Sequence, residues 1–360
     1  MENPSRTAHA QDVIPVRPGE ELDAGAVAKA LRGRVPGSDA PLRIEQFGGG
    51  HANLTYLLRF GEGPGACEYV LRRPPLGPVA PGSHDMLREF RALSSLWRAF
   101  PLAPRALAVC EDVSVIGAPF FVMERRRGVV VRGSVPEVFG GGRDAEANRK
   151  LAEVVVDTLA DFHAVDPEPL GLAGLGKPEG FLGRQVTGWA GRFERAKTGD
   201  DPVAEEVVRW LDEHLPVSPA PTPLHNDWRL DNMAVAEDDP GRCVAVYDWD
   251  MFTIGDPLAD LGTLLALWSD PGEGPPSMNP MPTQTPGFLT RAQAIARYGE
   301  RTGRDVSGVP YYLVFGTFKM AVVLQQIYFR FHRGQTQDAR FASLGEAARS
   351  LFRLAAERRP

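Results

Sequence analysis

The amino-acid sequence predicts an α+β protein with two lobes: an N-terminal antiparallel sheet with helix, and a mostly helical C-terminal lobe. This prediction depends on a change of pattern near residue 124. Before it, short runs of β-branched and aromatic residues alternate with Gly-rich turns, whereas after it apolar residues recur at helical spacing over long stretches. We therefore expect an N-terminal lobe over residues 1–124 and a C-terminal lobe over residues 125–360.

The N-terminal lobe begins with a polar, Pro-containing stretch, residues 1–20, which predicts a flexible tail. A first helix is expected around residues 23–32, and a second, with one apolar stripe, at residues 83–99. Glycine-rich turns between the strand candidates favour antiparallel pairing. The predicted strands span residues 42–47, 54–60, 68–73, 105–110 and 119–124.

Long helical patterns dominate the C-terminal lobe, beginning with an apolar stripe over residues 145–165. One strand pair, 232–236 with 243–247, is the only sheet structure expected there. The Pro-rich stretch 270–287 is too long for an ordinary connection, which predicts a mobile or functional loop. The further helices are expected at residues 185–196, 202–214, 257–268, 290–302, 310–331 and 337–358.

Composition narrows the class of function. With 46 acidic and 40 basic side chains the chain has a net charge of −6, which argues against a purely electrostatic nucleic-acid binder. No apolar run approaches the roughly 18 to 20 residues of a membrane span, and the N-terminus lacks a signal-peptide pattern. We expect a cytoplasmic protein with neither a nucleic-acid nor a membrane partner. Cys67, Cys110 and Cys243 form no Cys-x-x-Cys pair, so neither a disulfide framework nor a zinc site is expected. No pattern predicts an oligomeric state.

The most informative segment begins at His225. His225, Asp227 and Asn232 have the H-x-D-x-x-x-x-N spacing of a kinase catalytic loop, and Asp248 follows the next strand pair. Phosphoryl transfer needs a carboxylate that orients the attacking hydroxyl and accepts its proton, and oxygen ligands for Mg²⁺. Asp227 suits the first task. Asn232 and Asp248 lie at the two ends of one predicted hairpin, which would let them share a cation.

Asp and Asn are also common in turns and caps. However, a loop placed before a hairpin and an aspartate placed after it together favour phosphoryl-transfer chemistry.

This arrangement resembles the aminoglycoside phosphotransferase, or choline-kinase-like, family of the protein-kinase-like fold. The His225 loop resembles the family's H-G-D-x-x-x-x-N loop, and residues 247–250 resemble its I-D-W-E segment. The likeness is strongest to the phosphotransferase-like domains associated with acyl-CoA dehydrogenases. The segments that indicate this subgroup are residues 47–56, 69–75 and 254–261. The resemblance extends over roughly residues 44–268 and implies a kinase that binds ATP and Mg²⁺ between two lobes.

The resemblance assigns the N-terminal lobe to the nucleotide. Gly48, Gly49, Gly50 and Asn53 would belong to the loop that covers it, since glycines let a backbone approach phosphates closely. A triple glycine between two strands is by itself only a turn, and the chain has no Walker motif.

Arg72 occupies the position of the lysine that contacts the α and β phosphates in this fold, and Glu89 on the following helix is its expected partner. An arginine has the same charge but a bulkier, planar head. Met123, Glu124 and Arg126 resemble the hinge that binds adenine. Main-chain groups of Glu124 and Arg126 would face the base, with Met123 at the back of the pocket.

Asp256 precedes Pro257 and is expected to cap the next helix. The resemblance adds that Asp256 holds the backbone of the catalytic loop. His51, His84 and His163 have no metal-ligand partner at a suitable spacing and are expected to be structural or exposed.

We therefore predict an ATP- and Mg²⁺-dependent phosphotransferase that acts on the hydroxyl of a small molecule. No A-P-E segment follows Asp248, which argues against a protein substrate. Residues 225–260 hold nine acidic residues and two arginines, around the predicted metal site, whereas residues 331–360 hold six arginines and three acidic residues. The excess of arginines at residues 331–360 favours an anionic acceptor, such as a hydroxyacyl thioester or hydroxy acid. The alternatives are an aminoglycoside or amino-alcohol kinase, and a pseudokinase, which Arg72 and Asn226 would favour.

Overall fold

The computed structural model describes residues 13–48, 53–77, 84–273, 280–336 and 338–360. Contacts within the chain divide it into two compact units, and two short segments distant in sequence from residue 129 join the first unit. Unit 1 comprises Met1–Val129, Pro167–Leu175 and Val244–Phe252, and unit 2 comprises Val130–Asp166, Gly176–Cys243 and Thr253–Pro360. Asp248 therefore belongs to unit 1, although it follows a hairpin that begins in unit 2.

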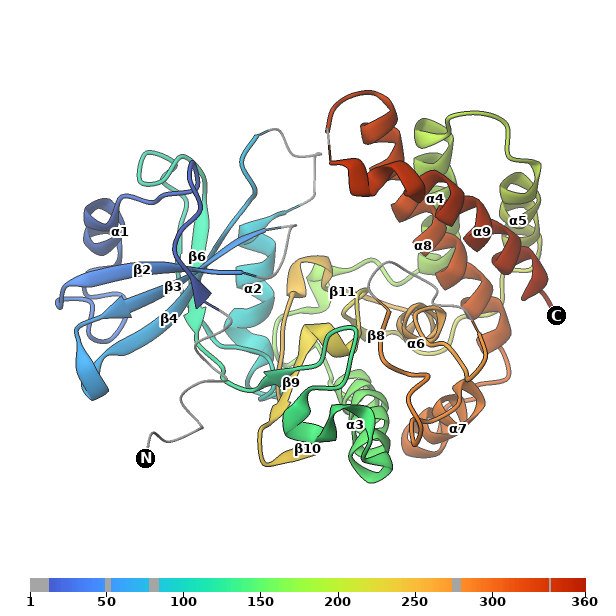
Figure 1. The fold of residues 1–360 in the computed structure, drawn as a ribbon, viewed down its shortest axis with the longest axis horizontal. Coiled ribbons are helices and arrows are strands. Elements are labelled where there is room, and N and C mark those ends of the chain that lie inside the picture. Colours follow the sequence, from blue (N-terminus) through green and yellow to red (C-terminus); the bar gives the residue numbers. More distant parts are fainter. Residues whose placement is uncertain (1–12, 49–52, 78–83, 274–279, 337) are drawn as a thin grey trace. The chain divides into compact units, whose positions relative to one another are not determined.

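Unit 1 contains a six-stranded antiparallel sheet in the order β1-β2-β3-β4-β6-β5 (Figure 1). The five strands and two helices predicted for this lobe are present. The elements are β1 (Val13–Ile14), α1 (Ala24–Leu31), β2 (Leu42–Phe47), β3 (Leu54–Phe60), β4 (Cys67–Arg73), α2 (Met86–Leu96), β5 (Ala106–Cys110) and β6 (Phe120–Glu124). The sixth strand, β1, corrects the prediction of a flexible tail for residues 13 and 14, because Ile14 pairs with Gln46, whereas residues 1–12 of the predicted tail lie outside the described residues.

Alternation along β4 determines which face of this sheet each residue reaches. Leu71 belongs to a buried apolar cluster that also contains Val27 and Leu31 of α1. The next residue, Arg72, points to the opposite face because side chains alternate along a strand, and there it meets Glu89 of α2.

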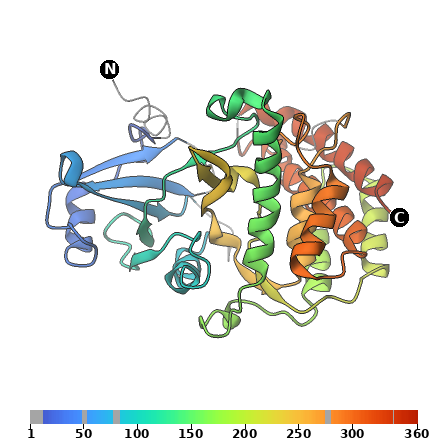
Figure 2. The same cartoon turned by 90° about the horizontal axis from the view of Figure 1, so that it is seen from below.

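Unit 2 is mostly helical, as predicted (Figure 2). Its helices are α3 (Ala145–His163), α4 (Phe181–Ala196), α5 (Pro202–Glu213), α6 (Pro257–Ala266), α7 (Arg291–Thr302), α8 (Val309–His332) and α9 (Leu344–Glu357). The helix predicted over residues 337–358 is instead a 3₁₀ turn, Ala339–Ser343, followed by α9. The other 3₁₀ turns are Gly63–Gly65, Glu137–Gly142, Ala173–Leu175, Leu230–Asn232 and Trp249–Met251.

The strands after residue 125 are more numerous than predicted. The expected hairpin is formed by β9 (Met233–Ala236) and β10 (Asp239–Val246), with β7 (Val129–Val130) beside β9. The expectation of a single strand pair was wrong, because β8 (Thr222–Leu224) also pairs with β11 (Thr253–Gly255). Three residues are too few for a recognisable alternation, and Pro223 conceals β8 further.

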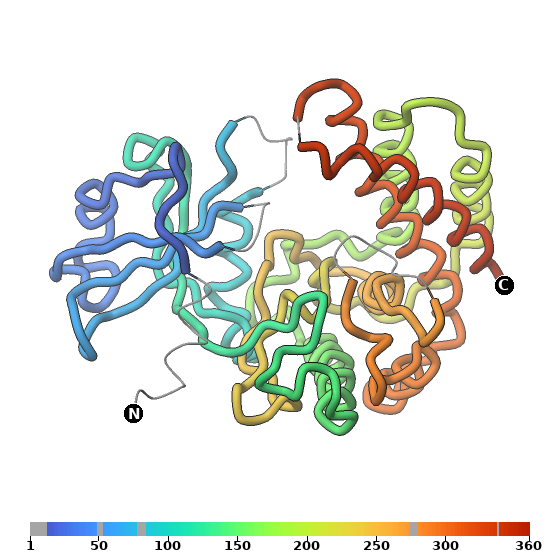
Figure 3. The backbone as a smooth tube through the Cα atoms, viewed as in Figure 1, coloured from blue at the N-terminus to red at the C-terminus, as the bar shows by residue number. Residues whose placement is uncertain are grey.

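Helices α6 and α8 pack with their backbones nearly in contact (Figure 3). A Cβ atom at Gly262 would lie 2.4 Å from the Tyr312 carbonyl oxygen, and one at Gly316 would lie 2.5 Å from the Gly262 oxygen. Only glycine permits this approach. By length and composition α8 could cross a membrane, which the sequence analysis did not predict, but 61% of its apolar window is buried. That burial is typical of a core helix.

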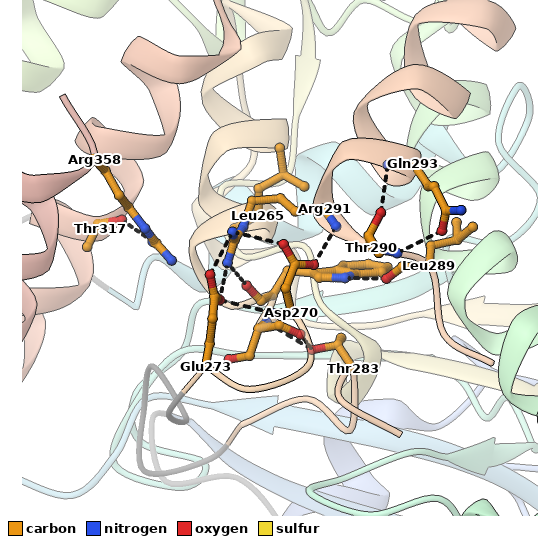
Figure 4. Close-up of polar contacts among 12 residues, drawn as sticks. Leu265, Asp270, Glu273, Thr283, Leu289, Thr290, Arg291, Gln293, Thr317 and Arg358 are labelled. Atoms are coloured by element: carbon orange, nitrogen blue, oxygen red, sulfur yellow. Dashed lines mark hydrogen bonds and ion pairs between the residues drawn. The ribbon is translucent and has the colours of Figure 1, made fainter. Parts of the chain in front are cut away.

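The start of the Pro-rich loop is held by Arg291, the first residue of α7 (Figure 4). Its guanidinium donates to the Trp268 carbonyl at 2.6 Å and forms ion pairs with Asp270 at 3.3 Å and Glu273 at 2.6 Å. Nearby, Arg358 donates to the Thr317 hydroxyl at 2.8 Å. Burial lowers the pKa of Arg358 to about 10, with a further contribution from the positive charge of Arg291.

Candidate active site

The predicted catalytic loop lies between β8 and β9 of unit 2 and ends in the 3₁₀ turn Leu230–Asn232. The Asn232 side-chain nitrogen donates to both the backbone oxygen and the Oδ2 atom of Asp227, at 2.8 Å each. The structure therefore brings together the residues predicted as the proton acceptor and as a metal ligand. Because the amide nitrogen of Asn232 holds Asp227, the Oδ1 atom of Asn232 is the one that would bind a cation.

Asp260, on α6, anchors the start of this loop. Its Oδ2 atom accepts from the His225 N–H and its Oδ1 atom from the Asn226 N–H, both at 2.7 Å. Burial alone would raise the pKa of the Asp260 carboxyl, but the hydrogen bonds from the His163 ring and the His225 N–H lower it below its usual range. The carboxylate is therefore the stable form, and both oxygens fix loop backbone.

His163, from α3, supports this carboxylate. Its Nε2 atom is 3.4 Å from Asp260 Oδ2, and its Nδ1 atom is 2.8 Å from the Tyr298 hydroxyl. A neutral imidazole that donates through Nε2 and accepts at Nδ1 satisfies both neighbours. Burial also lowers the pKa of His163, which favours the same neutral form. The structural role expected for His163 is confirmed.

Asp256 caps α6 as predicted, accepting from the Leu258 N–H at 2.9 Å. Its other oxygen accepts from the Tyr312 hydroxyl at 2.6 Å. The further expectation that Asp256 holds the catalytic loop was wrong, because Asp260, one helical turn later, makes those contacts. A carboxylate within an apolar helix was the signal that could have identified Asp260, since such a group is seldom buried without partners.

A second residue that sequence reasoning missed is Lys319, on α8. Its Nζ atom donates to the Asn226 carbonyl at 2.7 Å, and 9% of the residue is exposed. Burial lowers the pKa of Lys319, whereas the charges of Asp227 and Asp260 act in the opposite direction. Lys319 therefore combines a contact to the loop backbone with a positive charge close to Asp227.

In unit 1, Arg72 forms the predicted ion pair with Glu89 and a second one with Asp248. The distances are 3.4 Å from Nη1 to Glu89 Oε1 and 2.7 Å from Nη2 to Asp248 Oδ1. Burial raises the pKa of Glu89, and the Arg72 guanidinium opposes this shift. The two carboxylates outweigh the effect of burial on Arg72 and raise its pKa, so that it stays protonated.

Two buried donors near this pair suit the oxygens of a phosphate. Within the described residues, Arg72 Nε and Asn53 Nδ2 have no hydrogen-bond acceptor. Asn53 Oδ1 lies 2.8 Å from the Nδ1 atom of His84, a histidine that sequence analysis left without a binding role. Gly48 contacts Arg17 through its carbonyl, at 3.0 Å. Gly49 and Gly50, also predicted for the nucleotide loop, and His51 lie outside the described residues.

The predicted hinge residues occupy the end of β6 and the segment after it. Met123 is buried. The Glu124 N–H donates to the Arg105 carbonyl at 3.0 Å, and the Arg126 carbonyl accepts from the Tyr247 hydroxyl at 3.2 Å. Some of the main-chain groups predicted for adenine thus have protein partners, and the adenine-binding role stays a prediction.

The donor set matches Mg²⁺ in chemistry, because Asn232 and Asp248 supply oxygen ligands. The described residues contain no group of three or more His, Cys, Asp or Glu side chains that could hold a metal ion. Mg²⁺ seldom needs such a cage, since it keeps waters and binds one or two side chains together with substrate phosphates. The residues present therefore fit this ion, and joint ligation by Asn232 and Asp248 stays a prediction.

Three residues in or next to these groups have an unusual backbone conformation. In the part of the chain that the structure describes, three residues other than glycine have positive φ: His84 at 57°, Asn226 at 66° and Asp248 at 66°. This conformation is uncommon for residues with a Cβ atom and concentrates at functional sites. Each of the three is in, or directly contacts, the groups described above.

Comparison with known proteins agrees with this geometry. Residues 43–299 match the model of the family described as "Phosphotransferase enzyme family". The chain is 31% identical over 360 residues to acyl-CoA dehydrogenase family member 10 of Mus musculus, covering 95% of this chain and 31% of that protein. It is 32% identical to family member 11 of Gallus gallus, covering 88% of this chain and 41% of that protein. The chain thus spans well under half the length of these curated relatives.

Solved structures show the same fold. A candidate aminoglycoside phosphotransferase from Ralstonia eutropha superposes with a TM-score of 0.79 at 30% identity, covering 94% of this chain and 98% of that one. Choline kinase from Cryptosporidium parvum superposes with a TM-score of 0.65 at 12% identity, covering 93% and 95%. The predicted protein-kinase-like fold is confirmed.

Proposed function

The chain belongs to the phosphotransferase enzyme family, and we propose that it transfers the γ-phosphoryl group of ATP to the hydroxyl of a small anionic acceptor. The family and the fold identify a small-molecule kinase with a hydroxyl acceptor. The observation that carries the proposed mechanism is the Asp227 carboxylate, held by Asn232 in a loop whose backbone Asp260 fixes.

In the proposed reaction, Asp227 orients the acceptor hydroxyl and accepts its proton. The acceptor oxygen forms a bond to the γ phosphorus as the bond between that phosphorus and the β–γ bridging oxygen breaks, and ADP leaves with that oxygen. Asn232 keeps the carboxylate in one orientation. Arg72, together with the Asn53 amide, binds phosphate oxygens, and Glu89 keeps the Arg72 guanidinium in place.

Mg²⁺ would be held by Asn232 and Asp248 and would neutralise charge on the β and γ phosphates. Arg72 already occupies one oxygen of Asp248. Without the cation, the positive charge of Arg72 therefore balances the negative charge of Asp248.

The acceptor class that we propose is a hydroxyacyl thioester or hydroxy acid. Support comes from the curated relatives, whose names contain acyl-CoA dehydrogenase. The arginine-rich C-terminus supports it less than its composition suggested. Four of its six arginines form ion pairs with acidic residues: Arg340 with Asp338, Arg349 and Arg353 with Glu346, and Arg359 with Glu206.

Two measurements test the proposal. Mg²⁺-ATP at millimolar concentration should raise the melting temperature, because a ligand that binds only the folded state stabilises it, and EDTA should remove much of that increase. With hydroxy acids, hydroxyacyl thioesters, aminoglycosides and amino alcohols as acceptors, ADP release should require Asp227. We expect Asp227→Asn to lower kcat by about 10² to 10⁴.

Asp238→Asn is the matched control, because that carboxylate is 80% exposed in the turn between β9 and β10 and pairs with Arg242. Undiminished turnover by Asp227→Asn would refute the assignment of the base. Absence of any stabilisation by Mg²⁺-ATP would refute nucleotide binding.

A further inference from the structure

Two cationic side chains lie against Trp189 in unit 2. The Arg192 guanidinium carbon is 4.2 Å from the centroid of the Trp189 ring, and the Lys319 Nζ atom is 5.7 Å from it. Trp189 and Arg192 belong to α4 and Lys319 to α8, two helices that pack against each other (Figures 1 and 3). The aromatic ring thus gathers positive charge from two helices at one place.

This charge has no direct carboxylate partner. Over the described ranges, neither Arg192 nor Lys319 forms an ion pair with an acidic side chain. The charges of Asp227 and Asp260 both act on Lys319, but Asn232 holds the Oδ2 atom of Asp227, and Asp260 uses its oxygens for the loop backbone and for His163. Burial lowers the pKa of Arg192, and the positive charge of Arg195 adds to this effect. Lys319 is buried and Arg192 is exposed beside it, and two like charges held together favour a bound anion.

The position of Lys319 connects these cations with the proposed chemistry. Its Nζ atom donates to the carbonyl of Asn226, and the next residue in the chain is Asp227. Only one N–H of the ammonium group is needed for that contact, and an ammonium group has three. A molecule whose hydroxyl lies at Asp227 would therefore have its neighbouring groups within reach of Lys319.

We infer that Lys319 and Arg192, beside Trp189, form an oxyanion subsite that selects acceptors carrying a carboxylate or a phosphate near the reacting hydroxyl. This inference rests on the proposed function and narrows it to one substrate class. An acceptor with an ammonium group at this place would be repelled by both cations, so the subsite also discriminates against amino alcohols and aminoglycosides.

Four small hydroxyl compounds of similar size test the subsite: 3-hydroxybutyrate, glycerol phosphate, the neutral 3-hydroxybutyramide and the cationic 4-amino-2-butanol. Each is assayed for ADP release with the full chain, ATP and Mg²⁺. We expect kcat/KM to be highest for one of the two anions, lower for the amide and lowest for the amine. The two anions distinguish a carboxylate from a phosphate site.

Arg192→Gln is the diagnostic variant because Arg192 touches neither Asp227 nor the loop backbone. It should raise the KM for the preferred anion about tenfold, the usual value of one charge-assisted hydrogen bond, with kcat and the KM for the amide within about twofold. Arg195→Gln removes the same charge one turn away on α4 and should leave both constants unchanged. Lys319→Arg, which keeps the charge, should retain the preference for anions.

The outcomes separate this inference from the proposed function. Turnover of the amide or the amine at least as efficient as that of both anions would overturn the subsite alone, as would equal effects of Arg192→Gln and Arg195→Gln. Absence of turnover with all four compounds, together with no stabilisation by Mg²⁺-ATP, would overturn both.

Discussion

Replacing Asp260 by Asn tests whether this carboxylate fixes the catalytic loop. The substitution keeps the shape of the side chain and opens no cavity. However, Asp260 accepts from two N–H groups, of His225 and Asn226, at 2.7 Å each, and an amide offers only one oxygen. One buried N–H must therefore face the new NH₂ group, which costs about 1 to 3 kcal/mol, and the other hydrogen bond loses its charge assistance. Together with the lost charge beside His163, we expect a loss of about 3 to 5 kcal/mol in the free energy of unfolding.

Urea unfolding followed by tryptophan fluorescence measures this loss, because Trp228 in the loop stacks on Phe162 with ring centroids 5.6 Å apart. Asp161→Asn is the control, since that carboxylate is 55% exposed and pairs with Arg301 on the surface. Such a pair contributes about 0.2 to 1 kcal/mol. Equal effects of the two substitutions, or an unchanged kcat for Asp260→Asn, would refute the proposed role of Asp260.

Three further predictions concern other parts of unit 2. Because His163 is neutral in the folded state and its pKa is lowered there, protons favour the unfolded chain below about pH 6.5. The free energy of unfolding from urea titrations should fall on acidification from pH 7.5 to 5.5, by up to about 1.4 kcal/mol per pH unit, and an equal slope in His163→Gln would contradict this. Gly316→Leu should destabilise by several kcal/mol, about 3 or more, because its Cβ atom would meet the Gly262 backbone; an unchanged melting temperature would exclude that clash. Arg291→Met should lower the free energy of unfolding by about 1 to 3 kcal/mol, a range reduced for solvent screening because Glu273 is 40% exposed. A double-mutant cycle with Glu273→Gln should give a coupling energy above zero.

Local patterns in the sequence were sufficient for most of the fold. The strands β2 to β6 and the helix α3 have clear periodicity and clear boundaries, and the structure confirms them. Strands of two or three residues, such as β1, β8 and β11, have no period to detect. They form because longer elements place their backbones beside a partner strand, which is information that a local pattern does not contain.

The site could be predicted where its residues share one motif. Asp227 and Asn232 are five residues apart, and the structure brings them into contact as expected. Arg72 and Glu89 could be paired from their position on a strand and the next helix. Asp260 and Lys319 are 33 and 92 residues after Asp227 in the chain and are part of apolar helices. Their roles depend on how α6 and α8 pack, so sequence spacing could not reveal them.

The left-handed conformations at Asn226 and Asp248 connect these observations. Such a conformation costs about 1 to 3 kcal/mol and persists only where surrounding contacts impose it. Asn226 is held through its N–H by Asp260 and through its carbonyl by Lys319, while Asp248 is held by Arg72. In each case a charged side chain from a distant element holds a residue in or beside the proposed chemistry. Substitution of Asp260, Lys319 or Arg72 should therefore disturb the geometry of Asp227 or Asp248 as well as the local charge, and the loss of kcat should exceed the electrostatic effect of one charge.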